Sequence, residues 1–168
     1  MKLVITDVSV LFDLFHIKIL SEFFALDFEI YITVFVYDEI VNQEQIKEFE
    51  EFRQTGKLIV LDLSQEEEEQ VINFKTKRNL KSIPDKTMLW KAIQLNCPLL
   101  TCDAKLRKEA IDNGIQVHGS IWVLLALEKE KLIEKQRMIA LLEQIKLVNN
   151  RLPMVEIDKI MKRLKENE

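Results

Sequence analysis

The stretch Lys2-Leu3-Val4-Ile5-Thr6-Asp7 opens the chain with a short apolar run that stops at an acid. Leu3 to Thr6 has the length and the β-branched content of a buried strand. Asp7 then stands at the carboxyl end of that strand. In a parallel sheet, ligands bind outside this end of the strands. The opening residues therefore predict both a first strand and a candidate site.

An acid stands beside the end of an apolar run at three further places, which are Glu39 after residues 30–36, Asp85 before residues 88–93, and Asp103 after residues 98–102. Carboxylates gathered at the same edge of a sheet repel one another strongly at low dielectric. Hard divalent cations relieve such repulsion because they prefer carboxylate oxygens. The pattern predicts a Mg²⁺ or Mn²⁺ site held by Asp7, Glu39, Asp85 and Asp103.

Each of these acids also has a plainer interpretation when it is taken alone. Asp7, Asp85 and Asp103 stand near expected helix starts, where aspartate is a common N-cap. Glu39 lies inside a helical pattern and by itself is typical of a solvated face. His16 and His118 have no partner in the sequence that suggests a nucleophile or a zinc site. The joint order of the acids favours the shared metal site over four separate explanations.

Strand-length apolar runs alternate with helical stretches along the chain, which predicts an α/β fold with three layers and a mainly parallel central sheet. Gly56 should end one helix, and Ser64 with Glu67 should form a capping box that opens the next. The expected strands are residues 3–6, 29–33, 57–63, 99–102 and 115–118. The expected helices are residues 10–15, 17–24, 35–41, 44–53, 66–78, 85–96 and 103–113, followed by a helical remainder with breaks near residues 130 and 149–153.

Length and composition indicate a single globular unit. The 168 residues predict a domain over residues 1–130, with residues 131–168 as a helical extension packed on it. No apolar run has the roughly 18 residues of a membrane span, and an acid comes too early for a signal peptide. We therefore expect a cytoplasmic protein. Cys97 and Cys102 should be free thiols, because an extended run between them would hold them too far apart for a disulfide.

The charge balance excludes binding of nucleic acid by bulk positive charge. The formal net charge is −4, from 24 basic and 28 acidic residues, and without the four proposed site acids the counts are equal. A polyanionic substrate therefore remains compatible with the chain. A basic rim beside the acids, formed by Lys81, Lys86, Lys105 and Arg107, would guide the phosphates of such a substrate toward the metal. Ordinary solvated helix charge is the alternative explanation for each of them.

The whole chain resembles the PIN-domain ribonucleases, and most closely their toxin-like members related to VapC. Val4 to Leu11, with Ser9 two residues after Asp7, is similar to the first motif of that family. Three further segments are similar to its later motifs: residues 36–40 to the second, 80–92 to the third and 99–107 to the fourth. The stretch from Gly114 to Trp122 matches the strand and turn that usually follow.

This resemblance implies a metal-dependent endoribonuclease. Asp7, Glu39, Asp85 and Asp103 would hold Mg²⁺ or Mn²⁺, and Ser9 and Thr101 would orient ligands or metal-bound waters. A metal-activated water would cut the RNA phosphodiester and leave 5′-phosphate and 3′-hydroxyl ends. It also implies a cognate antitoxin as partner, contact with DNA only through that antitoxin, and a homodimer as a further alternative.

Two other functions compete with the nuclease. A catalytically silent PIN-like module would use the same fold to scaffold partners. A phosphoaspartyl phosphatase would use Asp7 as nucleophile, but Ser9 occupies the position where that chemistry usually has a second acid. The response of thermal stability to Mn²⁺ separates the first alternative from a metal-dependent enzyme.

Overall fold

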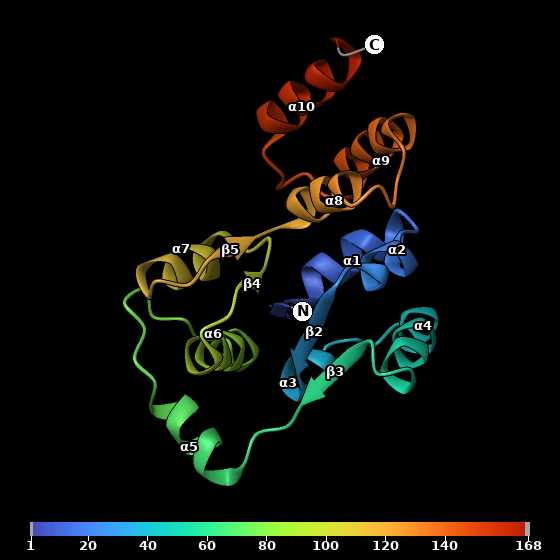
Figure 1. The fold of residues 1–168 in the computed structure, drawn as a ribbon. Coiled ribbons are helices and arrows are strands. Elements are labelled where there is room, and N and C mark those ends of the chain that lie inside the picture. The colour runs from blue at the N-terminus through green and yellow to red at the C-terminus, as the bar shows by residue number, and fades with distance from the viewer. Residues whose placement is uncertain (1, 167–168) are drawn as a thin grey trace.

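Five strands form one all-parallel sheet in the computed structural model, which describes residues 2–166 (Figure 1). The strand order is β3-β2-β1-β4-β5, so that β1 lies at the centre. Thr6 pairs with Leu100, and this register places the ends of β1 and β4 side by side. The strands are β1 (Lys2–Thr6), β2 (Phe28–Thr33), β3 (Leu58–Leu61), β4 (Leu99–Leu100) and β5 (Val117–His118).

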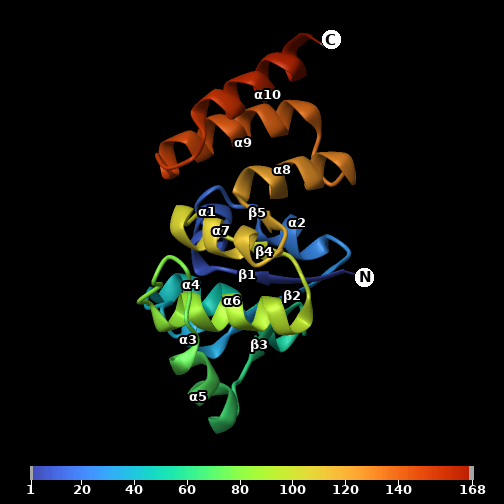
Figure 2. The ribbon, with the colours of Figure 1, turned by 90° about the vertical axis from the view of Figure 1, so that its left-hand side faces the viewer.

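Helices cover both faces of this sheet, which confirms the predicted three-layer α/β fold. Figure 2 shows α6 on one side of β1, and α1 and α8 on the other. The helices are α1 (Val8–His16), α2 (Leu20–Ala25), α3 (Val34–Tyr37), α4 (Gln43–Gln54), α5 (Gln65–Asn73), α6 (Ile83–Leu95), α7 (Ala104–Asp112), α8 (Ser120–Lys129), α9 (Lys135–Val148) and α10 (Met154–Glu166).

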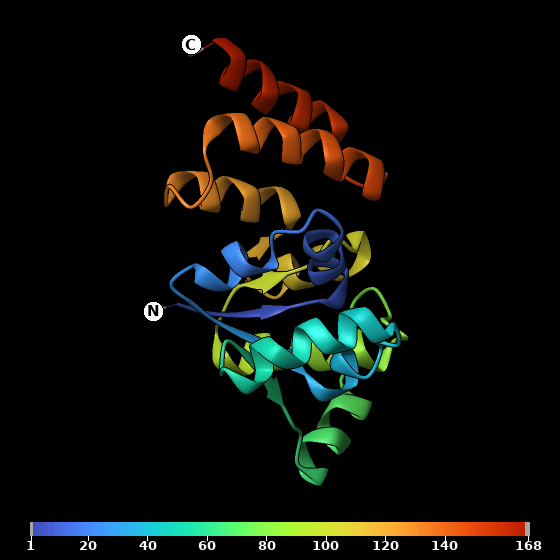
Figure 3. The ribbon, with the colours of Figure 1, turned by 90° about the vertical axis from the view of Figure 1, so that its right-hand side faces the viewer.

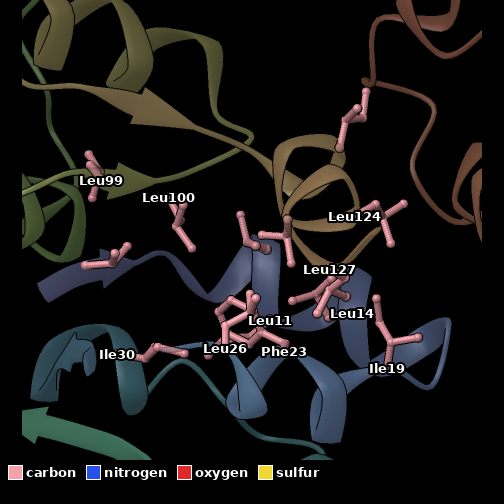
Figure 4. Packing of buried hydrophobic residues seen from close by; sticks show 14 of the residues in the cluster. Leu11, Leu14, Ile19, Phe23, Leu26, Ile30, Leu99, Leu100, Leu124 and Leu127 are labelled. Atoms are coloured by element: carbon pink, nitrogen blue, oxygen red, sulfur yellow. The ribbon is translucent and has the colours of Figure 1, made fainter. Parts of the chain in front are cut away.

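One large hydrophobic core joins the sheet to its helices. Leu11 and Leu14 of α1 lie close to Leu124 and Leu127 of α8, and all four are fully buried (Figure 4). Burial of a leucine side chain contributes roughly 1.5–3 kcal/mol, so this contact holds α8 firmly on α1. Phe23 of α2 is fully buried in the same cluster.

The last helices α8, α9 and α10 stack away from the sheet at one end of the molecule (Figure 3). Met138 and Leu142 of α9, with Ile157 of α10, are fully buried in the same core cluster as the sheet. The apolar spacing on each helix explains this, since residues three or four apart share one face. Among residues 2–166, no helix combines the length and the apolar character needed to cross a membrane.

The sequence pattern placed most elements within a few residues of their observed bounds. Gly56 follows the end of α4 with a φ of 70°, a conformation that favours glycine. The capping box of Ser64 and Glu67 is present at α5.

The expected helix over residues 66–78 was wrong in its second half, because α5 ends at Asn73. The backbone N–H groups of Lys77 and Arg78 instead donate to the buried carboxylate of Glu109, both at 2.8 Å. This long-range contact outweighs the local preference for helix.

Candidate active site

Asp7 is the most enclosed of the predicted site acids. It follows β1, and its backbone N–H donates to the Leu100 carbonyl at 2.8 Å, which fixes it against β4. Its carboxylate is 7% exposed and makes no capping hydrogen bond to α1. Burial raises the pKa of Asp7, while hydrogen bonds from Ser9 and Thr101 act in the opposite direction. Asp7 thus stands at the N-cap position of α1 as expected, but its side chain does not cap the helix.

Ser9 and Thr101 lie directly on the Asp7 carboxylate. The Ser9 hydroxyl donates to Oδ2 of Asp7 at 2.7 Å, and the Thr101 hydroxyl donates to the same oxygen at 3.0 Å. Thr101 also accepts the backbone N–H of Asp103 at 3.0 Å, so one hydroxyl links two of the acids. These contacts restrict the rotation of Asp7 and leave its Oδ1 without a side-chain donor among the described residues.

Asp103 caps a helix and also lies at the candidate site. It stands after β4 at the N-cap of α7, where its Oδ1 accepts the Leu106 N–H at 2.7 Å. The capping interpretation is therefore correct for Asp103. It does not exclude a second role, because a carboxylate has two oxygens and several lone pairs.

Asp85 is the acid whose pKa responds to the charges of all three others. It lies in the first turn of α6, where Ser82 and not Asp85 is the cap. Burial and, after it, the negative charges of Asp7, Asp103 and Glu39 together raise its pKa to about 6, against a lowering effect of the Ser82 hydrogen bond. The carboxylate of Asp85 therefore interacts electrostatically with the other three acids, although the four come from separate parts of the chain.

Glu39 lies at the margin of the group. The expected helix over residues 35–41 ends at Tyr37, so Glu39 falls in an exposed turn after α3 and not inside a helix. Burial and then the charge of Asp7 raise its pKa. Charge thus couples Glu39 to Asp7 and Asp85, but its side chain does not line the cleft that the other three acids share.

Asp7, Asp85 and Asp103 line one cleft of about 530 Å³, here called the acidic cleft. Its remaining walls come from α1, the β4–α7 turn and the segment between α9 and α10: they are Ser9, Phe12, Asp13, His16, Cys102, Val148, Asn149, Asn150 and Arg151. Three predicted acids and Ser9 therefore meet at the carboxyl ends of β1 and β4, while Thr101 lies beneath them.

The donor chemistry of this group suits a divalent cation. Within residues 2–166, none of the four acids forms an ion pair with lysine or arginine, so their mutual repulsion is not neutralised by the protein. Oxygen-only donors of this kind are those that Mg²⁺ and Mn²⁺ prefer. In the side-chain positions of the described residues, however, no three acidic, histidine or cysteine groups are arranged to ligate one ion.

Asp13 is a buried acid that our sequence reasoning missed. It is 5% exposed and accepts hydrogen bonds from Ser120 at 2.6 Å and from the amide of Asn149 at 2.9 Å and 3.2 Å. The Cys102 thiol is a further donor at 3.6 Å. A sequence signal existed: Asp13 follows Ser9 by four residues, which puts both on one face of a helix.

A second cleft of about 500 Å³ adjoins the acidic cleft and shares Cys102 and Arg151 with it. Thr101, Arg107, His118 and Trp122 contribute to its wall. Our sequence analysis assigned no role to His118, Trp122 or Arg151. Their convergence depends on the packing of α8 and α10, which local patterns do not reveal.

The four basic residues expected to contact RNA lie in different environments. Arg107 lines the second cleft. Lys105 donates to the Asn79 carbonyl at 2.9 Å. Lys81 and Lys86 line neither cleft. None of these four residues lines the acidic cleft, and their contact with RNA remains a prediction.

Comparison with known proteins identifies the family of the chain. A family model described as a PIN domain matches residues 3–166. Among solved structures, the chain is similar to a PilT N-terminus domain protein from the hyperthermophilic archaeon Sulfolobus solfataricus P2, with 16% identity over 74% of this chain and 92% of that chain and a TM-score of 0.47. None of the curated proteins matches the chain. PIN domains are generally nucleases, and the family model extends over nearly all of the sequence: the chain belongs to the PIN domain family.

Proposed function

We propose that this protein is a metal-dependent endoribonuclease and the toxin of a toxin–antitoxin pair. One observation carries the proposal: Asp7, Asp85 and Asp103 line one cleft, where burial and the charges of Asp7, Asp103 and Glu39 raise the pKa of Asp85 to about 6. A cluster of acids that is left without a basic partner is costly unless a cation joins it. The chain also belongs to a family whose members are generally nucleases, and this supports a catalytic role for the cluster.

The chain itself contributes binding, orientation and charge. Asp7, Asp85 and Asp103 would hold the ion from the acidic cleft, with Glu39 at its margin. When bound, a divalent ion supplies an acidified water and neutralises charge that develops on phosphate. Ser9 and Thr101 hold Asp7 in one orientation through their hydrogen bonds to Oδ2. Such partners tune both the geometry and the affinity of a metal ligand.

The proposal is tested by incubating the protein with a mixed panel of RNAs, with Mg²⁺ or Mn²⁺ and with EDTA. We expect cleavage only with metal, and 5′-phosphate ends on the products. Asp7→Asn should lower the rate roughly a hundredfold or more, because it removes charge from the centre of the cluster. Its stability should be maintained or raised, since one repelling carboxylate is lost. Equal rates for Asp7→Asn and the parent would refute the assignment.

Asp38→Asn is the matched control, because Asp38 is exposed, stands beside Glu39 and lines neither cleft. It should cleave RNA as the parent does. A parent that binds metal but cuts none of the RNAs would instead favour the catalytically silent scaffold. The phosphatase alternative is disfavoured because no lysine among the described residues lines the acidic cleft.

The toxin role makes a separate claim about the partner. We propose a small antitoxin encoded by a neighbouring gene, with the protein acting in the cytoplasm on cellular RNA. Expression of the parent alone should arrest growth, whereas expression of Asp7→Asn should not. Co-expression of the adjacent reading frame should restore growth. Growth arrest by Asp7→Asn to the same extent would separate toxicity from nuclease activity and overturn this part of the proposal.

A further inference from the structure

The second cleft has the character of a binding site rather than a packing defect. It is about 500 Å³ in volume, and it opens beside the acidic cleft with Cys102 and Arg151 on the boundary between them. Thr101 links the two, because it lines the second cleft while its hydroxyl holds Asp7 at 3.0 Å. A ligand in the second cleft would therefore lie next to the acids.

A stacked aromatic pair forms part of the wall. The rings of His118 and Trp122 are nearly parallel, at 13°, with centroids 4.1 Å apart. Phe28 stacks on Trp122 at 5.7 Å and holds that ring in place. Both His118 and Trp122 remain half-buried and reach the cleft. Rigid aromatic surfaces of this kind bind nucleobases by stacking, and they do so with little dependence on sequence.

Two arginines supply positive charge to the same cleft. The guanidinium of Arg107 donates to the carbonyls of Thr101 at 3.5 Å and Val117 at 3.3 Å, which positions it without neutralising it. Arg151 is exposed at the junction of the two clefts. Neither forms an ion pair within residues 2–166. Guanidinium groups that keep free donors are well suited to phosphate.

We propose that the second cleft binds one nucleotide of single-stranded RNA, immediately next to the bond that is cut in the acidic cleft. The base packs against His118 and Trp122, and Arg107 and Arg151 contact the adjoining phosphates. The aromatic and cationic groups match the two parts of a nucleotide, and the shared boundary of the clefts matches a continuous strand. This inference rests on the proposed ribonuclease activity for its context, but its test does not need catalysis.

The test uses tryptophan fluorescence, because the chain has only Trp90 and Trp122. Trp90 lines neither cleft, so Trp90→Phe leaves Trp122 as the sole reporter. This change is combined with Asp7→Asn to prevent cleavage, and the protein is titrated with a single-stranded RNA tetranucleotide in EDTA. We expect saturable quenching of Trp122. A mononucleotide should bind at least tenfold more weakly than the tetranucleotide.

Two charge variants should change the affinity for the tetranucleotide in opposite directions. Arg151→Glu should weaken binding of the tetranucleotide about tenfold. Glu156→Gln should strengthen it several-fold, because Glu156 is exposed and is an acid on the wall of the second cleft. Arg163→Glu is the matched control: Arg163 is an exposed arginine of α10 that lines neither cleft, and its reversal should leave the affinity near that of the parent.

Failure of this inference is distinguishable from failure of the proposed function. Absence of quenching, or equal affinities for Arg151→Glu and Arg163→Glu, would overturn the subsite even if the parent cleaves RNA. Equal binding of the mononucleotide and the tetranucleotide would identify a site for free nucleotides and overturn the RNA subsite. Binding as expected in a parent that never cleaves RNA would support the subsite and refute only the nuclease. Anisotropy of labelled tetranucleotide with the parent in EDTA repeats the measurement without the tryptophan change.

Discussion

Asp85 shows at the scale of one residue how the fold concentrates charge. It is partly buried in the first turn of α6, and three other carboxylates raise its pKa. The cause is tertiary, since Asp7, Glu39 and Asp103 come from distant parts of the sequence. The sequence identified these residues because each stands at the end of an apolar run. It did not identify their unequal positions, with Asp7 enclosed and Glu39 at the margin.

The raised pKa of Asp85 predicts how the metal-free protein responds to pH. The pKa of this group is about 6 in the folded chain and near 3.8 in the unfolded chain, so the folded state binds more protons between these values. The contribution of Asp85 to stability is therefore greatest below pH 4 and is lost as the pH rises toward 6. Urea unfolding in EDTA should show that Asp85→Asn reduces the fall in stability across this window.

Asp38→Asn serves as the control for this measurement, since Asp38 is exposed and lines neither cleft. It should retain the slope of the parent between pH 4 and pH 6. If Asp85→Asn and Asp38→Asn have the same slope as the parent, the carboxyl group of Asp85 does not carry the repulsion that the site requires.

At the scale of elements, the side chain of Asn149 joins the turn between α9 and α10 to α1. The amide of Asn149 donates two hydrogen bonds to Asp13 of α1, and its carbonyl oxygen accepts the backbone N–H of Arg151 at 3.0 Å. Asn149 thus satisfies a buried carboxylate and also shapes the turn that carries Arg151 to both clefts. A helix break was expected here from residues 149–153, but local pattern does not reveal this long-range contact.

Asn149→Asp should destabilise the protein by roughly 2 kcal/mol or more, because it removes donors to a charged group and sets two carboxylates against each other. The substitution keeps an oxygen for the Arg151 N–H, so it isolates the contact with Asp13. Asn150→Ala, at an exposed neighbouring position, should change stability by no more than about 0.5 kcal/mol. Chemical denaturation measures both. Equal stabilities for the two variants would show that the contact with Asp13 contributes little.

At the scale of the whole molecule, a metal site shared by distant elements should connect ion binding to global stability. Mn²⁺ at about 100 times its Kd stabilises a protein by roughly 2.7 kcal/mol, which corresponds to a rise in Tm of about 5–10 °C for a chain of this size. Thermal unfolding with increasing Mn²⁺ should show this rise in the parent and a much smaller one in Asp7→Asn. A rise of the same size in both would indicate binding elsewhere.

The sequence predicted the layers because they follow from local pattern, and local pattern also selected the four acids, of which three line one cleft. Alternating strand and helix runs leave few arrangements for a parallel sheet, and the carboxyl ends of its strands define one edge. The second cleft did not follow, because Arg107, His118, Trp122 and Arg151 meet only once α8 and α10 have packed. The early end of α5 could not be predicted for the same reason, because the residues after it donate hydrogen bonds to Glu109 of α7.

The two outermost strands of the sheet are short: β3 has four residues and β5 has two. Such margins offer few free backbone groups to a neighbouring chain, which is how natural proteins avoid uncontrolled β-pairing. Two copies of this protein would therefore not associate by extending one sheet into the next. Self-association would therefore have to use helical surfaces.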